Sequence, residues 1–130
     1  MKIGMRIPGK MRNLSYDELA AWAKSVGLDA IDLPGPSAEA KAALDRAGLA
    51  VGTVDASSVG ASLSKDEAAR AKAVAQIKAE IDTMASLGMS TLFVCLIPAD
   101  TTMPRADSFA IFKETYPEIV AHAASKGVSL

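Results

Sequence analysis

Cysteine, histidine and aromatic residues are scarce in this sequence, and neither sign of charge dominates. Among its 130 residues, Cys95 is the single cysteine. An internal disulfide is therefore excluded, and a reducing compartment is favoured, so we expect a cytoplasmic protein. The 14 basic and 15 acidic side chains leave a net charge of −1. A nucleic-acid-binding protein needs a basic face that displaces counterions from phosphates, and this charge balance disfavours that class.

Long apolar runs are also missing. Half of the residues are hydrophobic, but no segment approaches the roughly 18 consecutive apolar residues of a membrane span, so we expect no membrane partner. The first residues, MKIGMRIPGKMRN, include basic side chains but neither a continuous apolar segment nor a small-residue cleavage site, which disfavours a signal peptide. The length and composition predict a soluble protein with a single domain over residues 1–130.

One pattern recurs along the chain: a helix-like stretch, a glycine, and then a short apolar run. It appears in KSVGLDAIDLP, DRAGLAVGTVD, ASLGMSTLFVCL and SKGVSL. The four glycines are Gly27, Gly48, Gly88 and Gly127, and each is predicted to end a helix in the left-handed conformation, where a Cβ would cost energy. The apolar runs predict strands at residues 2–7, 30–33, 50–54 and 91–96, and a fifth strand that begins at residue 128.

The predicted helices begin with recognisable capping signals. SYDE and SKDE are Ser-x-x-Glu capping boxes, which place the first residues of two helices after Ser15 and Ser64. Ser37 is predicted to open a further helix. The last helix is predicted to begin near Asp107 and to kink or break at Pro117, because proline removes a backbone donor.

Strands that alternate with helices predict an α/β fold with a parallel sheet. The third and fourth apolar runs do not alternate with polar residues, which is typical of strands buried on both faces. Two architectures fit this pattern, a doubly wound open sheet and a (β/α)8 barrel. The long loops DASSVGASL and IPADTTMPRA follow strands, and both architectures bind their ligands at the carboxyl ends of the strands.

Candidate functional residues lie at these strand ends. Asp32 and Asp55 are predicted to face one pocket as metal ligands, acceptors for substrate hydroxyls or a general base. The alternative is that each carboxylate only accepts hydrogen bonds from the loop after it. Arg6 is a candidate to neutralise an anionic substrate, with outward solvation as the alternative. Cys95 is most simply a small core residue, and the alternative is a thiol in the pocket wall.

Neither a metal motif nor a phosphate loop is recognisable. His122 and Cys95 are the only soft ligands and belong to different predicted elements, so they do not form a zinc constellation. GMRIPGK has the spacing of a phosphate loop, but Met11 stands where a serine or threonine should bind Mg²⁺, and Pro8 removes an amide from the cradle. We therefore assign no metal ligand and no nucleotide site.

Five segments together resemble the first half of the sugar phosphate isomerase/epimerase family, which has the xylose isomerase-like TIM barrel. These segments are MKIGMRI, LSYDELAAWAKSVGLDAIDLP, KAALDRAGLAVGTVDA, AKAVAQIKAEIDTMASLGMSTLFVCL and IVAHAASKGVSL. A barrel of eight units in about 250 residues takes about 31 residues per unit. The resemblance thus implies the first four to four-and-a-half units of a (β/α)8 TIM barrel, a half-barrel whose fifth strand begins at GVSL.

The resemblance also implies an activity. Such enzymes are sugar or sugar-phosphate isomerases or epimerases of carbohydrate metabolism, which transfer a proton between adjacent carbons of a ketose with the help of a divalent metal, Mn²⁺, Mg²⁺, Co²⁺ or Zn²⁺. The family's metal ligands lie on the fifth and later strands, so we expect none in this chain and expect the 130 residues to lack activity alone. Arg6, Asp32, Asp55 and Cys95 match strand ends that would form half of the substrate pocket.

Two departures and two alternatives accompany this resemblance. The family often has a glutamate where Asp32 stands, and often a histidine near the third or fourth strand end, which this sequence lacks. Truncation from a longer enzyme is one interpretation. The chain is otherwise a small flavodoxin-like binding or regulatory module, or a structural half-barrel that pairs with a second copy or with a complementary C-terminal half. An isolated half-barrel leaves unpaired strand edges, which favours such a homo-oligomer or complex.

Overall fold

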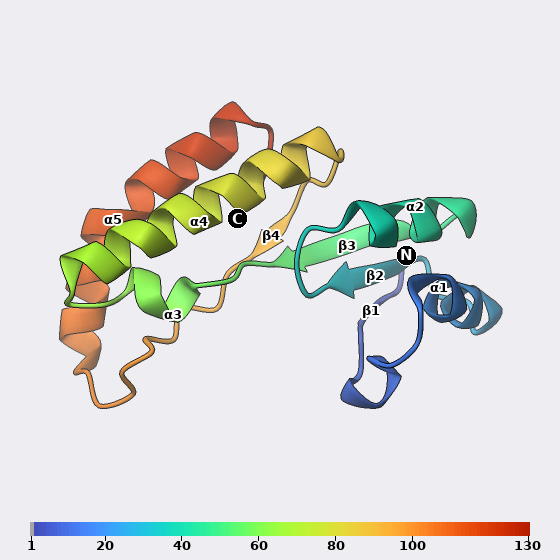
Figure 1. The fold of residues 1–130 in the computed structure, drawn as a ribbon, viewed down its shortest axis with the longest axis horizontal. Coiled ribbons are helices and arrows are strands. Elements are labelled where there is room, and N and C mark those ends of the chain that lie inside the picture. Colours follow the sequence, from blue (N-terminus) through green and yellow to red (C-terminus); the bar gives the residue numbers. More distant parts are fainter. Residues whose placement is uncertain (1) are drawn as a thin grey trace. The chain divides into compact units, whose positions relative to one another are not determined.

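Strands and helices alternate along the chain in the computed structural model, which describes residues 2–130 (Figure 1). The elements in chain order are β1 (Gly4–Arg6), the 3-10 helix η1 (Gly9–Met11), α1 (Tyr16–Ser25), β2 (Ala30–Leu33), α2 (Ala38–Arg46), β3 (Ala50–Asp55), α3 (Val59–Ser62), α4 (Glu67–Ser86), β4 (Leu92–Phe93) and α5 (Arg105–Ser125). The chain divides into two compact units, the first ending at Asp55 and the second running from Ala56 to Leu130. Each is described by itself.

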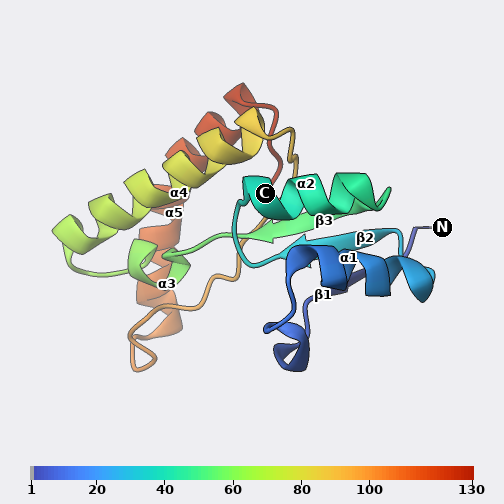
Figure 2. The ribbon, with the colours of Figure 1, turned by 45° about the vertical axis from the view of Figure 1, so that its right-hand side comes forward.

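The first unit has three parallel strands and two helices. β1 pairs with β2, and β2 pairs with β3, so β2 is the middle strand. Helices α1 and α2 lie side by side next to these strands (Figure 2). In a flavodoxin-like sheet the first strand lies between the second and the third. The observed order is instead that of successive strands in a barrel, which argues against the flavodoxin-like alternative.

The caps of the first unit form as the sequence predicts. The Glu18 N–H donates to Ser15 Oγ at 3.3 Å, and the Ser15 N–H donates to Glu18 Oε2 at 2.9 Å, which completes the capping box. Ser37 Oγ accepts from the Ala40 N–H at 3.2 Å. The helices bury mainly small side chains against the sheet, and these are Leu19, Ala20 and Ala23 from α1 and Ala40, Ala43 and Leu44 from α2.

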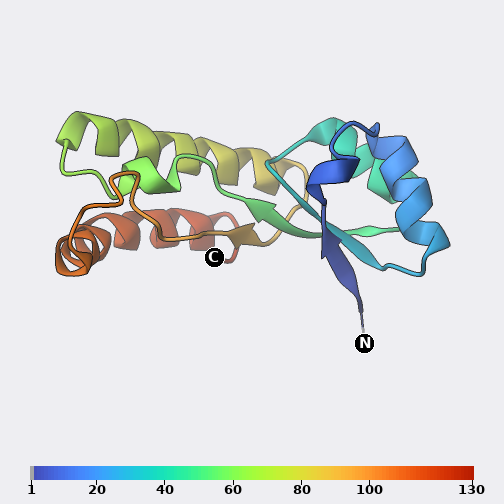
Figure 3. The same cartoon turned by 90° about the horizontal axis from the view of Figure 1, so that it is seen from below.

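The second unit is built on two long helices. α4 and α5 lie side by side and run in the same direction (Figure 3). Their buried apolar side chains include Val74, Ile77, Ile81 and Met84 from α4 and Tyr116, Ile119 and Ala123 from α5. Over residues 2–130, none of the helices combines the length and the apolar character that crossing a membrane requires.

The glycines that follow helices take the predicted conformation. The φ angles of Gly27, Gly48, Gly88 and Gly127 are 82°, 67°, 68° and 71°. A side chain at such an angle would strain the backbone, which is why a glycine ends each of these helices.

The predicted start of one helix is wrong, and one of the two alternatives predicted for another helix does not occur. Ser64 does not cap α4, because the helix begins two residues later, at a cap formed by Asp66, whose Oδ1 accepts from the Ala68 and Ala69 N–H groups at 2.9 and 3.2 Å. Ser64 Oγ instead accepts from the Asp66 N–H at 3.1 Å. Of the two alternatives at Pro117, the break does not occur, since α5 continues from Arg105 to Ser125 with the proline inside it, and the kink stays a prediction.

The fourth strand is shorter than predicted. The apolar run over residues 91–96 predicts a strand throughout, but β4 covers only Leu92–Phe93. Beyond it, Leu96 and Ile97 are 45% and 62% exposed. An apolar run alone does not distinguish a buried strand from an apolar surface loop.

A single parallel bridge stands where a fifth strand was predicted. Thr91 pairs with Ser129, and the Leu92 N–H donates to the Ser129 carbonyl at 2.8 Å. The Ser129 N–H in turn donates to the Ser90 carbonyl at 2.8 Å. The residues after Gly127 therefore pair in parallel with the start of the fourth strand.

Candidate functional site

Arg6 and Asp55 meet at the carboxyl end of the first unit's sheet. Arg6 is the last residue of β1 and Asp55 the last of β3, and the Arg6 guanidinium donates to Asp55 Oδ2 in an ion pair. Asp32, on the middle strand, lies opposite Arg6 in the register of β1 and β2. Three of the four predicted substrate-binding residues therefore lie on neighbouring parallel strands.

Asp32 stabilises a β-bulge between β2 and β3. Ile31 lies opposite Val51, but Leu33 lies opposite Val54, so β3 has one residue more than β2 between these pairs. Asp32 Oδ1 accepts a hydrogen bond from the N–H of Thr53, one of the two β3 residues in between, at 2.7 Å.

The other residue in the bulge is Gly52. A Cβ on Gly52 would overlap Asp32 Oδ1, which explains why a glycine stands there. The alternative that Asp32 accepts a hydrogen bond from the loop after it does not hold for Oδ1. The donor lies on the adjacent strand and not in the loop after Asp32.

One oxygen of Asp55 is buried without a partner. Oδ2 accepts from Arg6, whereas Oδ1 is buried and meets no hydrogen-bond donor in the part of the chain that the structure describes. An unsatisfied buried carboxylate oxygen costs free energy. A hydroxyl group of a ligand or a water molecule would remove this cost, but it first has to displace the atoms that now cover Oδ1.

A cavity of about 510 Å³ lies at this end of the sheet. This volume is within the range of ligand pockets, about 300–1,000 Å³. Three carboxylates and two guanidinium groups line the cavity, and they belong to Asp32, Glu39, Asp55, Arg6 and Arg12. Ile7, Met11, Leu14 and Leu19 form an apolar wall. A molecule with several hydroxyl groups and C–H faces would match both parts of this lining.

Arg12 and Glu39 are lining residues that the sequence interpretation missed. Arg12 directly follows η1, in the connection between β1 and α1, and Glu39 lies in the first turn of α2, after the loop that leaves β2. Both segments follow strand ends. Charged side chains within the first turn after such loops are the signal that would have identified them.

Cys95 lies in the second unit and does not line this cavity. The prediction of a core residue is wrong, because the thiol is exposed. β4 ends at Phe93, and the chain then turns tightly, with the Ile97 N–H donating to the Cys95 carbonyl at 2.8 Å. A role of Cys95 in substrate binding stays a prediction.

A buried glutamate anchors the loop that begins the second unit. Glu80, on α4, is 8% exposed and accepts from the Ser57 N–H at 3.0 Å, from the Ser57 hydroxyl and from Gln76 Nε2 at 3.2 Å. The next residue, Ser58, adopts a left-handed φ of 56°. In the sequence, Glu80 lies on the same face of the helix as Ile77 and Ile81, and a charged residue among these apolar positions was the signal that could have identified the buried glutamate.

A second buried polar pair joins α3 to α5. The hydroxyl groups of Ser62 and Tyr116 lie 3.2 Å apart, and Ser62 Oγ also donates to the Val59 carbonyl at 2.7 Å. Burial raises the pKa of the Tyr116 phenol, and the hydrogen bond with Ser62 acts in the opposite direction. This pair lies at the buried end of a row of aromatic rings along α5.

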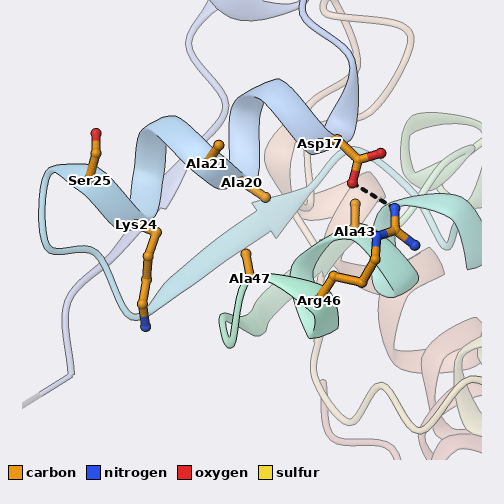
Figure 4. A pocket seen from close by; sticks show the side chains of 8 residues that line it. All are labelled: Asp17, Ala20, Ala21, Lys24, Ser25, Ala43, Arg46 and Ala47. Atoms are coloured by element: carbon orange, nitrogen blue, oxygen red, sulfur yellow. Dashed lines mark hydrogen bonds and ion pairs between the residues drawn. The ribbon is translucent and has the colours of Figure 1, made fainter.

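A cavity of about 500 Å³ also lies between α1 and α2 (Figure 4). Its lining includes the methyl groups of Ala20, Ala21, Ala43 and Ala47. Arg46 donates to Asp17 Oδ1 at 2.6 Å, and Lys24 Nζ donates to the Gly48 carbonyl at 3.4 Å. These charged groups already bind protein atoms, so the groove is a feature of helix packing and a weaker candidate for a ligand site.

The described residues do not fit a divalent metal. Among residues 2–130, no three histidine, cysteine, aspartate or glutamate side chains come together as a ligand set. Asp32 and Asp55 are the acidic pair at the strand ends, and one oxygen of each already binds Thr53 or Arg6. Because no third side-chain ligand joins this pair among residues 2–130, we assign no metal ligand to these residues.

Comparison with known proteins identifies the family. Residues 18–130 match the family described as the xylose isomerase-like TIM barrel. The chain belongs to this family. Its alternating strands and helices are those of the first half of the barrel, so the fold that the sequence predicts is confirmed. None of the curated proteins compared with this xylose isomerase-like chain matches it in sequence.

Several solved sugar epimerases are similar in structure. D-psicose 3-epimerase, crystallised with D-fructose, has a TM-score of 0.77 and 19% identity, with 100% of this chain and 51% of that chain covered. 3-keto-D-glucoside 4-epimerase from E. coli has a TM-score of 0.79 and 22% identity, with 98% of this chain and 54% of that chain covered. L-ribulose 3-epimerase has a TM-score of 0.75 and 18% identity, with 100% of this chain and 48% of that chain covered. This chain thus spans about half the length of these structures, and such identities show a shared fold.

Proposed function

We propose that this chain supplies half of the substrate pocket of a sugar or sugar-phosphate isomerase or epimerase. The observation that carries the proposal is the buried, unpartnered Asp55 Oδ1, which lies beside the Arg6 ion pair at the strand ends where TIM barrels bind their substrates. The cavity there is lined with both hydrogen-bonding groups and apolar side chains. Family membership and the similarity to several sugar epimerases support the substrate class.

In this proposal the three strand-end residues bind and orient the sugar. Asp55 Oδ1 accepts from one hydroxyl group of the sugar, and the Arg6 guanidinium, held by Asp55, donates to a second oxygen. The fixed ion pair limits the rotation of both side chains, so the ordering cost on binding is small. Asp32 Oδ1 already binds Thr53, so Asp32 binds the sugar through its other oxygen.

The proton transfer itself requires groups beyond those described. Moving a proton between adjacent carbons needs a base and an acid within reach of both carbons. In this proposal, residues outside this chain supply the base and the acid, and they also supply the ligands of the divalent metal (Mn²⁺, Mg²⁺, Co²⁺ or Zn²⁺). Turnover by this chain alone is therefore expected to be absent.

Sugar binding by the ¹⁵N-labelled chain tests the proposal. Titration with D-fructose and D-fructose 6-phosphate is expected to shift the amide resonances of Arg6, Thr53 and Asp55. Asp55→Asn should weaken binding about tenfold, since a hydrogen bond to a charged acceptor contributes about 1.5–3 kcal/mol. Asp17→Asn is the matched control, because Asp17 also pairs with an arginine but does not line the cavity.

Two results would contradict this proposal. Ligand-induced shifts confined to residues away from the strand ends would place the sugar elsewhere. Robust isomerase turnover by this chain with Mn²⁺ or Co²⁺ would show that the reacting groups lie within it and that the assignment of its residues to substrate binding alone is wrong.

The partner of the chain is also part of the proposal. Half of a barrel leaves strand edges to be covered, so a second copy or a complementary C-terminal half is the expected partner. Light scattering distinguishes a dimer, the result expected for two paired halves, from a stable monomer, which contradicts pairing with a second copy. A reducing, cytoplasmic location is proposed from the single free cysteine.

A further inference from the structure

We propose that the second unit holds a binding site for a small amphipathic anion, a molecule with an apolar body and one carboxylate or sulfonate group. The site is a cavity of about 470 Å³ between the loop after β4 and the first turns of α5. Its apolar lining includes Leu63, Leu96, Ile97, Met103, Phe109 and Phe112. The polar lining is limited to Thr101, Arg105 and Ser108.

The apolar side chains at the cavity are unusually exposed. Ile97 is 62% exposed, Phe109 56% and Leu96 45%. These three lie around one cavity and are not scattered singly over the surface. Clustered exposed apolar groups mark binding surfaces, because a ligand that covers them removes their area from water.

The aromatic wall of the cavity is backed by a row of rings. Phe109 stacks on Phe112 with a centroid distance of 6.0 Å, and Phe112 contacts Tyr116 at 4.8 Å. The hydroxyl of Tyr116 is anchored to the buried Ser62 at 3.2 Å. The exposed ring of Phe109 is therefore the end of an ordered stack and offers a fixed platform to a ligand.

The loop on the other side of the cavity is also held in place. The Ala99 N–H donates to the Gly60 carbonyl, on α3, at 3.1 Å. A Cβ on Gly60 would stand 3.0 Å from Ala99 N and 3.1 Å from the Ile97 carbonyl oxygen, so any larger residue here would push the loop away by a few tenths of an ångström. Because both walls are fixed by contacts within the unit, the cavity is formed before a ligand arrives.

Charge at the cavity selects an anion. Arg105, the first residue of α5, lines the cavity, and Lys113 Nζ lies 5.2 Å from the Phe109 ring centroid. The nearby carboxylates are engaged elsewhere. Asp107 pairs with Lys65 at 2.6 Å, and Asp100 Oδ1 accepts from the Thr102 N–H and hydroxyl. Arg105 and Lys113 are thus positioned to pair with a negative group on an apolar ligand.

Two fluorescent probes of similar shape test this site. 1-Anilinonaphthalene-8-sulfonate has the apolar body and an anion, and N-phenyl-1-naphthylamine has the same body without charge. The sulfonate is expected to bind about tenfold more tightly than the neutral probe. Arg105→Gln should weaken sulfonate binding about fivefold and leave the neutral probe unchanged, whereas Phe109→Ser should weaken both. Arg46→Gln, in the first unit and outside this cavity, is the control that should change neither.

The folded state of each variant is checked by amide resonance dispersion and near-ultraviolet circular dichroism. Shifts caused by the sulfonate are expected at residues 96–103 and 105–112. The proposal is wrong if Arg105→Gln leaves the affinity ratio of the two probes unchanged, or if the shifts lie outside these segments. It is also wrong if sedimentation shows a Phe109-dependent dimer that excludes both probes, because a second copy would then be the occupant.

Discussion

Gly52→Ala tests the assignment of Asp32 to the β-bulge. The new methyl group would overlap Asp32 Oδ1, so the carboxylate has to rotate away and give up its 2.7 Å hydrogen bond from the Thr53 N–H. Losing a bond to a charged acceptor costs about 1.5–3 kcal/mol. Alanine returns about 0.4–1 kcal/mol by restricting the unfolded chain, so the net loss of stability is about 1–2 kcal/mol.

Urea unfolding followed by fluorescence measures this loss. Trp22, the single tryptophan, lies on α1 of the same unit and reports its unfolding. With a urea dependence of about 1–1.5 kcal/mol per molar, the midpoint is expected to fall by about 1 M. Gly35→Ala is the matched control, since a Cβ at Gly35 meets nothing within 4 Å, and it should leave the midpoint unchanged or raise it slightly.

A double-mutant cycle decides the mechanism. Asp32→Ala alone removes the same hydrogen bond, so in that background Gly52→Ala should keep only its effect on the unfolded chain and stabilise by about 0.4–1 kcal/mol. The expected coupling free energy is then that of the hydrogen bond, about 1.5–3 kcal/mol. If Gly52→Ala is equally destabilising with and without the carboxylate, the clash with Asp32 is not the cause, and the explanation of the bulge is refuted.

Three further predictions concern the helices. Asp66→Ala should lower the free energy of unfolding by about 1 kcal/mol, measured by thermal unfolding, because Asp66 caps α4. Ser64→Ala should lower it by less than half of that, and equal losses would contradict the assignment of the cap. The Ser15 hydroxyl and N–H hold the pKa of Glu18 below its usual 4.5, so this stabilisation is complete above pH 4.5 and is lost as the pH falls through the lowered value. The urea midpoint should therefore fall on acidification, and an equal fall in Ser15→Ala would disprove the role of the hydroxyl. Glu80→Ala should destabilise the second unit by about 3 kcal/mol, measured by amide hydrogen exchange, because its three hydrogen bonds are lost in a buried position; a loss below about 1 kcal/mol would contradict the anchor.

Local signals predicted the helix ends and most of the strands. Gly27, Gly48, Gly88 and Gly127 were identified because the left-handed conformation restricts residue type at a single position. The start of α4 was misplaced because Ser64 and Asp66 are both good caps; in the structure Asp66 caps the helix, while the Ser64 carbonyl accepts from Arg70 Nη1, six residues along the chain, at 2.7 Å.

The sequence predicted which candidate residues lie at the strand ends, but it did not predict the contacts that these residues make with residues distant in sequence. Arg6, Asp32 and Asp55 follow from their positions at the carboxyl ends of β1, β2 and β3. The ion pair between Arg6 and Asp55 joins residues 49 positions apart, and no local pattern encodes it. Cys95 was misread because the apolar residues after β4 line a surface cavity instead of extending the sheet.

The bridge between Thr91 and Ser129 determines when the second unit becomes complete. Its two hydrogen bonds join the ends of a segment that contains all of α5, and Val128 beside it is only 4% exposed. Helices form within about a microsecond from contacts near in sequence, whereas closing a long segment pays its loop entropy before gaining any bond. We therefore expect the amide of Leu92 to gain its protection from solvent among the last in this unit.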